Sequence, residues 1–191
     1  ISNGVTSIYE VAFAGCTGLT SITIPDSVTS IGYEAFANCK SLESIHLPDG
    51  VTNIGGLAFA HCYALKEINL PDSLTTIGEE AFRGVPIAEV VIPANVTEIA
   101  DWTFYYNGEL RSLTLPDGLK KIGANAFCGA SKLQSVELPE SLEEIGDAAF
   151  RESGLTSITI PGNVKRLGGA FIYCKNLEKV SIAPGVETIG A

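Results

Sequence analysis

The sequence predicts a solenoid of stacked parallel strands, built from repeats of about 23 residues. The first observation behind this prediction is that all eight phenylalanines share one register, with spacings of 21 to 23 residues. The second is that seven of the nine prolines share another register with a similar period. The two registers comprise Phe13, Phe36, Phe59, Phe82, Phe104, Phe127, Phe150 and Phe171, and Pro25, Pro48, Pro71, Pro93, Pro116, Pro139 and Pro161.

The chain divides into seven complete repeats and two partial ones. We therefore predict a single repeat domain over residues 1–191. Solenoids normally carry polar caps at their ends, and both ends of this chain hold an unfinished repeat, so we expect the chain to be part of a longer protein. The complete repeats span residues 19–41, 42–64, 65–86, 87–109, 110–132, 133–154 and 155–176, and the partial ones span 1–18 and 177–191.

Each repeat begins with a segment in which apolar and polar residues alternate, such as Ile22-Thr23-Ile24. This pattern predicts a strand with one buried face. Stacked in parallel on the concave face, such strands lie about 4.8 Å apart. Pro25 ends the strand because it has no N–H for the ladder, and Asp26-Ser27 favours a turn. Val28 and Ile31 then point inward, a pattern that also allows a second ladder of short strands.

The rest of the repeat contains a glycine, a phenylalanine and a short turn. Gly32 supplies either a permissive backbone angle or room for close packing. The segment around Phe36 is long enough for only one or two helical or 3-10 turns. Phe36 and Leu42 are expected to stack inward on their equivalents, so a phenylalanine ladder forms the spine of the core. Burial contributes about 1.5 to 3 kcal/mol for each such side chain.

The columns L-x-x-I-x-I-P-x-x-V-x-x-I-G-x-x-A-F-x-x-C resemble the BspA-like, or Treponema-type, leucine-rich repeats over the whole chain. This resemblance implies a leucine-rich repeat solenoid of the α/β or mainly β class. It also implies a surface-exposed or secreted protein of a host-associated microbe, in a family linked to adhesion, binding of host matrix proteins and contact between cells. The repeat motif specifies only the scaffold, so no functional residues carry over with it.

One column departs from the general leucine-rich consensus. Its Asn or Cys position holds serine, glycine or asparagine in this chain, so no asparagine ladder is expected. The residues are Ser27, Gly50, Ser73, Asn95, Gly118, Ser141, Asn163 and Gly185.

Composition excludes several classes of partner. The net charge of -10 repels a polyanionic backbone, so we expect no nucleic-acid partner. No apolar run approaches the roughly 20 residues that span a bilayer, so this segment is not expected to insert into a membrane.

The cysteines and histidines do not form a recognisable catalytic or metal-binding pattern. Cys16, Cys39, Cys62 and Cys174 share one repeat position, which favours a ladder of buried thiols over a disulfide or a metal site, and no C-x-x-C pair exists. His46 and His61 stand outside any Ser-His-Asp or Cys-His arrangement. We therefore predict no catalytic residues, no metal site and no cofactor.

An acidic column follows the prolines. It allows two interpretations, ordinary turn chemistry and a calcium site, of which turn chemistry is favoured. The column comprises Asp26, Asp49, Asp72, Asp117 and Glu140.

Two sets of residues are candidates for an interaction surface. Trp102, Tyr105 and Tyr106 surround Phe104, and such aromatics are typical interface anchors, although they could instead cover a thinner repeat beside Pro86-Ile87. The other set occupies the outward positions of the predicted strands, at Thr23, His46, Asn69, Val91, Thr114, Glu137 and Thr159.

The sequence thus predicts a non-enzymatic protein-interaction module, and the family resemblance implies that it lies at the cell surface or outside the cell. Its expected partner is a protein, which the resemblance implies to be one of the host extracellular matrix or cell surface. The alternatives are a structural spacer within a larger surface protein and a carbohydrate-binding surface.

Overall fold

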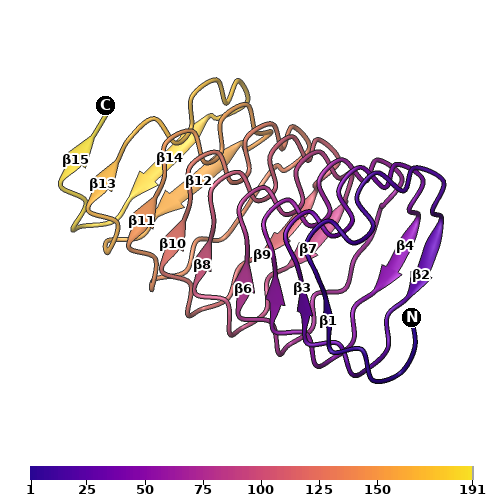
Figure 1. Ribbon diagram of the computed structural model, residues 1–191. Coiled ribbons are helices and arrows are strands. Elements are labelled where there is room, and N and C mark those ends of the chain that lie inside the picture. Colours follow the sequence, from indigo (N-terminus) through magenta and orange to yellow (C-terminus); the bar gives the residue numbers. More distant parts are fainter. Residues whose placement is uncertain (191) are drawn as a thin grey trace.

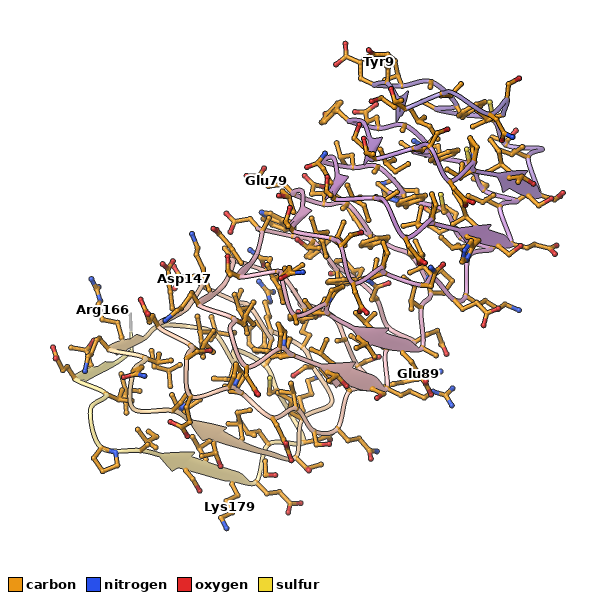
Figure 2. All side chains as sticks on the ribbon, turned by 90° about the horizontal axis from the view of Figure 1, so that it is seen from below. Tyr9, Glu79, Glu89, Asp147, Arg166 and Lys179 are labelled. Carbon is orange, nitrogen blue, oxygen red and sulfur yellow. The ribbon has the colours of Figure 1, made fainter. Side chains whose placement is uncertain are left out.

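The computed structural model describes residues 1–190 as an elongated solenoid whose two termini lie at opposite ends (Figure 1). Each repeat makes one turn of the solenoid. No helix forms within residues 1–190. Figure 2 shows Glu89 and Lys179 on the side of the longer strands and Tyr9, Glu79 and Asp147 on the opposite side.

The longer strands pair in parallel and in register, two by two. Their polar residues face outward, as the alternation of the sequence predicts. Pairing is interrupted at residues 67–69 and 135–137, which lie in two of the three 22-residue repeats, 65–86 and 133–154. The pairs are β2 (Ser21–Thr23) with β4 (Ser44–His46), β7 (Glu89–Val91) with β9 (Ser112–Thr114), and β12 (Ser157–Ile160) with β14 (Lys179–Ile182).

The second, shorter ladder also forms, and it is the more continuous of the two. Each of its strands has two residues, of which the second is apolar, and this residue is buried in every strand except β15 at the C-terminal end. The strands make two parallel sheets, of four and five strands. They are β1 (Ser7–Ile8), β3 (Ser30–Ile31), β5 (Asn53–Ile54) and β6 (Thr76–Ile77), then β8 (Glu98–Ile99), β10 (Lys121–Ile122), β11 (Glu144–Ile145), β13 (Arg166–Leu167) and β15 (Thr188–Ile189).

Hydrogen-bonded turns replace the helical or 3-10 segments that the sequence suggests around each phenylalanine. The residues two before and two after the phenylalanine have positive φ in most repeats, and this left-handed conformation interrupts a helical path. These positions are Val11, Glu34, Leu57, Glu80, Trp102, Asn125 and Ala148 before it, and Gly15, Asn38, His61, Gly84, Tyr106, Gly129, Glu152 and Tyr173 after it.

Amide hydrogen bonds in this turn segment alternate in direction. The amide of Phe36 donates to the carbonyl of Ala58 in the next repeat at 2.8 Å, whereas the amide of Ala37 donates back to Glu34 within the turn at 3.1 Å. The same alternation recurs along the solenoid. The turn segments therefore act as a third ladder between repeats, although they contain no strand.

The core is the expected phenylalanine spine. Successive rings stack with centroids 5.3 to 5.6 Å apart and with interplanar angles of 14° or less. Six of the eight rings are fully buried, and only Phe13 and Phe171, near the two ends, are half-buried.

The column that lacks an asparagine ladder holds mixed hydrogen bonds instead. The Ser27 hydroxyl donates to the carbonyl of Val5 at 2.7 Å, and Ser73 makes the equivalent bond to Val51 at 2.6 Å. Asn95 donates through its amide to the carbonyl of Asp72 at 2.9 Å. Since Gly118 and Ser141 separate the two asparagines of this column, no continuous asparagine ladder runs through residues 1–190.

A column of glycines after the shorter strands gives room for close packing. A Cβ atom added to Gly55 would lie 2.7 Å from the carbonyl carbon of Gly32, and one added to Gly78 would lie 2.4 Å from the amide nitrogen of Gly56. The φ angles of Gly32, Gly55 and Gly78 are not in the left-handed region, whereas that of Gly190, after the last shorter strand, is positive. Of the two roles open to Gly32 and its equivalents, the structure therefore shows close backbone approach.

Ala100 stands in this glycine column and carries the methyl group that the other members exclude. The shorter-strand ladder divides at this repeat, where β6 ends one sheet and β8 begins the other. The neighbouring hydrogen bond from the amide of Glu80 to the carbonyl of Asp101 is 3.2 Å long. The equivalent hydrogen bond in the preceding repeat, from the amide of Leu57 to the carbonyl of Glu79, is 2.8 Å long. The division of the sheet thus falls where the Ala100 methyl group interrupts the glycine column.

Replacing Gly55 with alanine should lower the free energy of unfolding by about 1 to 3 kcal/mol, because the new methyl group would overlap backbone that cannot move aside freely. Urea unfolding followed by circular dichroism measures this change. Gly108→Ala is the matched control, since its nearest neighbour would lie 3.6 Å away. Equal effects of the two substitutions would contradict the close-packing role.

Candidate functional site

The longer-strand face presents all seven outward residues that the sequence singles out. Thr23, His46, Asn69, Val91, Thr114, Glu137 and Thr159 are exposed. They do not converge on one site. Asn69 and Val91 line one shallow opening, between residues 66–70 and 88–91, and Thr114 and Glu137 line another, between residues 111–115 and 135–137.

Asn69 has a structural role. Its side-chain amide donates to the carbonyl of Leu47 at 3.0 Å, and its side-chain oxygen accepts from the amide of Leu47 at 3.3 Å. The side chain thus takes the place of a backbone partner where the longer-strand ladder is interrupted. This use of both polar atoms makes Asn69 a weaker candidate for ligand contact than Val91, which is 65% exposed.

Trp102, Tyr105 and Tyr106 do come together, and we call them the aromatic cluster. The rings of Trp102 and Tyr105 meet edge to face with centroids 4.7 Å apart, and those of Tyr105 and Tyr106 do so at 4.3 Å. The guanidinium of Arg83, in the preceding repeat, lies 5.2 Å from the centroid of Tyr105. Arg83 also forms an ion pair with Glu80.

Burial in the aromatic cluster raises the pKa of Tyr105, and the nearby Tyr106 hydroxyl raises it further. Tyr106 is 56% exposed and has a φ of 56°. A bulky residue in the left-handed region is strained by roughly 1 kcal/mol or more, and glycine relieves that strain at the same position in Gly84 and Gly129. Non-glycine residues also hold this conformation at the same position in four other repeats, at Asn38, His61, Glu152 and Tyr173.

The cysteine column is only partly buried. Cys39 and Cys62 are buried, Cys174 is half-buried and Cys16 is exposed, so the expectation of a fully buried ladder fails at the N-terminal end. All five cysteines are free thiols. The Cys39 thiol donates to the carbonyl of Phe13 at 3.1 Å, and Cys62 makes the same bond to Phe36 at 3.2 Å. These thiols therefore satisfy backbone carbonyls between repeats.

Neither histidine lies in a catalytic arrangement. His61 Nδ1 lies 3.0 Å from the Tyr63 hydroxyl, and burial lowers the pKa of His61, with the positive charge of Arg83 lowering it further. His46 is exposed on β4. Among residues 1–190, no three or more His, Cys, Asp or Glu side chains are grouped so as to hold a metal ion.

Charges follow two different patterns along the solenoid. On the shorter strands the signs alternate, and Lys121 pairs with Glu98 at 3.2 Å and with Glu144 at 3.7 Å. At the corner after the longer strands, the five residues of the acidic column are exposed. The shorter-strand charges therefore largely neutralise one another, whereas the carboxylates of the acidic column share this corner with no alternation of sign. Within residues 1–190, no helix has the length and apolar character needed to cross a membrane.

A notch that the repeat pattern did not reveal lies on the turn side of repeat 133–154. In most repeats the next leucine lies six positions after the phenylalanine, as in Phe127 and Leu133, but Phe150 and Leu155 are only five positions apart. The two-residue turn at this point is lost, which leaves an opening between its neighbours. The opening is lined by Ser131, Glu152, Ser153, Tyr173, Lys175 and Asn176. The repeat length was visible in the sequence, but only the structure shows what the missing residue exposes.

The thiol of Cys62 should resist alkylation in the folded protein. Burial raises its pKa to about 12, so almost no thiolate, the reactive form, exists at pH 8. In the unfolded chain the thiol ionises near its ordinary pKa, so this group makes the fold less stable as pH rises from about 9 to about 12. Iodoacetamide labelling followed by peptide mass spectrometry should modify Cys16 first and Cys62 only after unfolding. Equal labelling rates would contradict this assignment.

Comparison with known proteins agrees with the fold. The family model described as a BspA type leucine-rich repeat region matches residues 1–111 and 97–191. A leucine-rich repeat protein from Bacteroides ovatus ATCC 8483 is 30% identical, with a TM-score of 0.76, over 97% of this chain and 66% of that chain. The T. pallidum leucine-rich repeat protein is 36% identical, with a TM-score of 0.73, over 79% of this chain and 72% of that chain.

No curated protein matches the chain. The chain spans about two thirds of the length of the Bacteroides ovatus protein. The family model nevertheless covers all of its repeats, and both solved structures have the same solenoid architecture. The chain therefore belongs to the BspA-type leucine-rich repeat family.

Proposed function

We propose that residues 1–191 form a single repeat domain that acts as a non-enzymatic protein-binding module, in adhesion to a host macromolecule. The observation that carries this proposal is the aromatic cluster of Trp102, Tyr105 and Tyr106. Tyrosine, tryptophan and arginine dominate the energetics of protein interfaces, and here Arg83 lies against the same rings.

The distribution of chemistry in the chain supports a binding role over a catalytic one. The phenylalanines, the buried cysteines and the glycine column all serve the stacking of repeats. What remains for function lies on exposed surfaces, namely the longer-strand face and the turn side. Leucine-rich repeats are typical scaffolds for presenting such extended surfaces.

The proposed location is the cell surface or the extracellular space, with a host matrix or cell-surface protein as partner. Its support is the membership of the BspA-type family. The competing proposal is a spacer within a larger surface protein, which is favoured by the small polar residues of the longer-strand face, such as Thr23, Thr114 and Thr159.

A panel of immobilised host matrix proteins and glycans tests the proposal. The wild-type chain should bind at least one protein, and Tyr106→Ala and Trp102→Ala should each weaken that binding at least tenfold, as expected at an interface hot spot. Tyr9→Ala is the matched control, because Tyr9 is 79% exposed and lies near the N-terminal end. Biolayer interferometry measures the affinities.

The panel separates the three functions. Absence of binding to every protein and glycan would overturn the adhesion proposal and favour the spacer. Binding to glycans alone would favour a carbohydrate-binding surface. Binding that survives both aromatic substitutions but is lost in Val91→Arg would move the docking site to the longer-strand face.

A further inference from the structure

The chain contains two notches of the same origin, at its two repeats with a shortened turn. Phe82 and Ile87 are five residues apart, as are Phe150 and Leu155. The repeats begin at residues 65 and 133 and thus lie three units apart. In each, a full two-residue turn stands on both sides of the shortened one, at Tyr63-Ala64 and Gly108-Glu109 around the first notch and at Ser131-Lys132 and Lys175-Asn176 around the second.

A tyrosine of the chain itself covers the first notch. A Cβ atom added to Gly84, in the short repeat, would lie 3.6 Å from Cε1 of Tyr63 and 3.3 Å from Nδ1 of His61. The Tyr63 hydroxyl is held by His61 at 3.0 Å. The residue at the floor of this notch is Val85, which is fully buried. The phenol ring of Tyr63 thus lies over the backbone where a residue is missing.

The second notch lacks this ring. Ser131 occupies the position of Tyr63, four residues after the phenylalanine, and its short side chain reaches only the carbonyl of Gly108 at 3.4 Å. The space above the short repeat is open and measures about 660 Å³, within the range of pockets that hold small ligands.

The walls of the second notch combine one aromatic ring with polar groups. Tyr173 is 63% exposed, and the guanidinium of Arg151 lies 5.1 Å from its ring centroid, as Arg83 lies over Tyr105 beside the first notch. Glu152 accepts a hydrogen bond from Arg151 at 3.1 Å, which directs its carboxylate toward that neighbour.

The floor of the second notch is polar, unlike that of the first. Ser153 replaces Val85 there and is 4% exposed, with its hydroxyl 3.2 Å from the sulfur of Cys174. Cys174 in turn lies 3.0 Å from the carbonyl of Phe150. A ligand group that ends in a hydroxyl would therefore meet the hydrogen-bonding hydroxyl of Ser153 at the base of this notch. A purely apolar group would form no hydrogen bond with it.

We propose that the second notch binds a tyrosine side chain of the protein partner, in the place that Tyr63 fills in the first notch. This inference rests on the proposed protein-binding function and specifies where the partner inserts its anchor. The structure supports a planar phenol because the same shortened turn is already covered by one. Tyr173 offers a ring for edge or face contact, and Ser153 offers a hydroxyl partner.

The probe for this site is N-acetyl-L-tyrosinamide, with N-acetyl-L-alaninamide and N-acetylglucosamine as comparison ligands. Titration into the 15N-labelled chain should shift the amide resonances of Ser131, Glu152, Ser153 and Tyr173, and neither comparison ligand should do so. Ser131→Tyr should reduce the affinity for the probe at least tenfold, because the introduced ring fills the notch. Its melting temperature should not fall below that of the wild type.

Lys40→Tyr is the matched control. It places a tyrosine at the same position beside a complete repeat and should leave probe binding unchanged. The proposal is overturned if the probe binds Ser131→Tyr as tightly as the wild type, if the shifts occur elsewhere, or if only N-acetylglucosamine binds.

The adhesion proposal and the notch proposal can fail separately. If the matrix panel is negative while the probe binds at Ser131 and Tyr173, the pocket stands and the adhesion role falls. If a matrix protein binds the wild type and Ser131→Tyr equally and the probe does not bind, the adhesion role stands and the notch proposal falls.

Discussion

Close stacking of equivalent backbone segments is the constraint on which the rest of this structure depends. Successive phenylalanine rings lie 5.3 to 5.6 Å apart. Successive turns are joined by backbone hydrogen bonds, such as that from the amide of Phe36 to the carbonyl of Ala58. At this separation a methyl group does not fit in the glycine column, and the ladder divides where Ala100 supplies one. The left-handed turn residues serve the same end, because they allow every second amide to reach the next repeat.

Stacking also determines which side chains can recur at one position. Equivalent residues of neighbouring repeats face each other at close range, so a column of like charges is unfavourable unless it is well exposed. The shorter strands meet this condition by alternating sign, as in Glu98, Lys121 and Glu144. The acidic column meets it by exposure at a corner. The aromatic cluster and the second notch are departures from the repeat pattern that stacking does not require.

Much of the scaffold could be predicted from sequence because its evidence is periodic. The phenylalanine spine, the longer strands and the inward Val28 and Ile31 follow from columns that repeat in every unit. The conformation of the turn segments could not be predicted, since the sequence of a short polar segment such as that around Asn38 is also compatible with a helical turn. Only the structure shows that Asn38 and its equivalents adopt the left-handed conformation. The notch was equally hidden, because a missing residue shows where a turn is short but not which neighbour covers it. Tyr63 and Ser131 occupy equivalent positions, but the ring of Tyr63 covers the first notch whereas the short side chain of Ser131 leaves the second notch open.

The most direct test of the stacking account is residue-resolved amide hydrogen exchange. The amides of Phe59, Phe82 and Phe104 each donate to the following repeat within a segment that contains no strand or helix. The account predicts that these amides exchange only through global unfolding, and as slowly as those of Ile54 and Ile122 in the shorter strands. Exchange as fast as that of the exposed Asp49-Gly50 turn would contradict it, because the turn segments would then contribute no ladder between repeats.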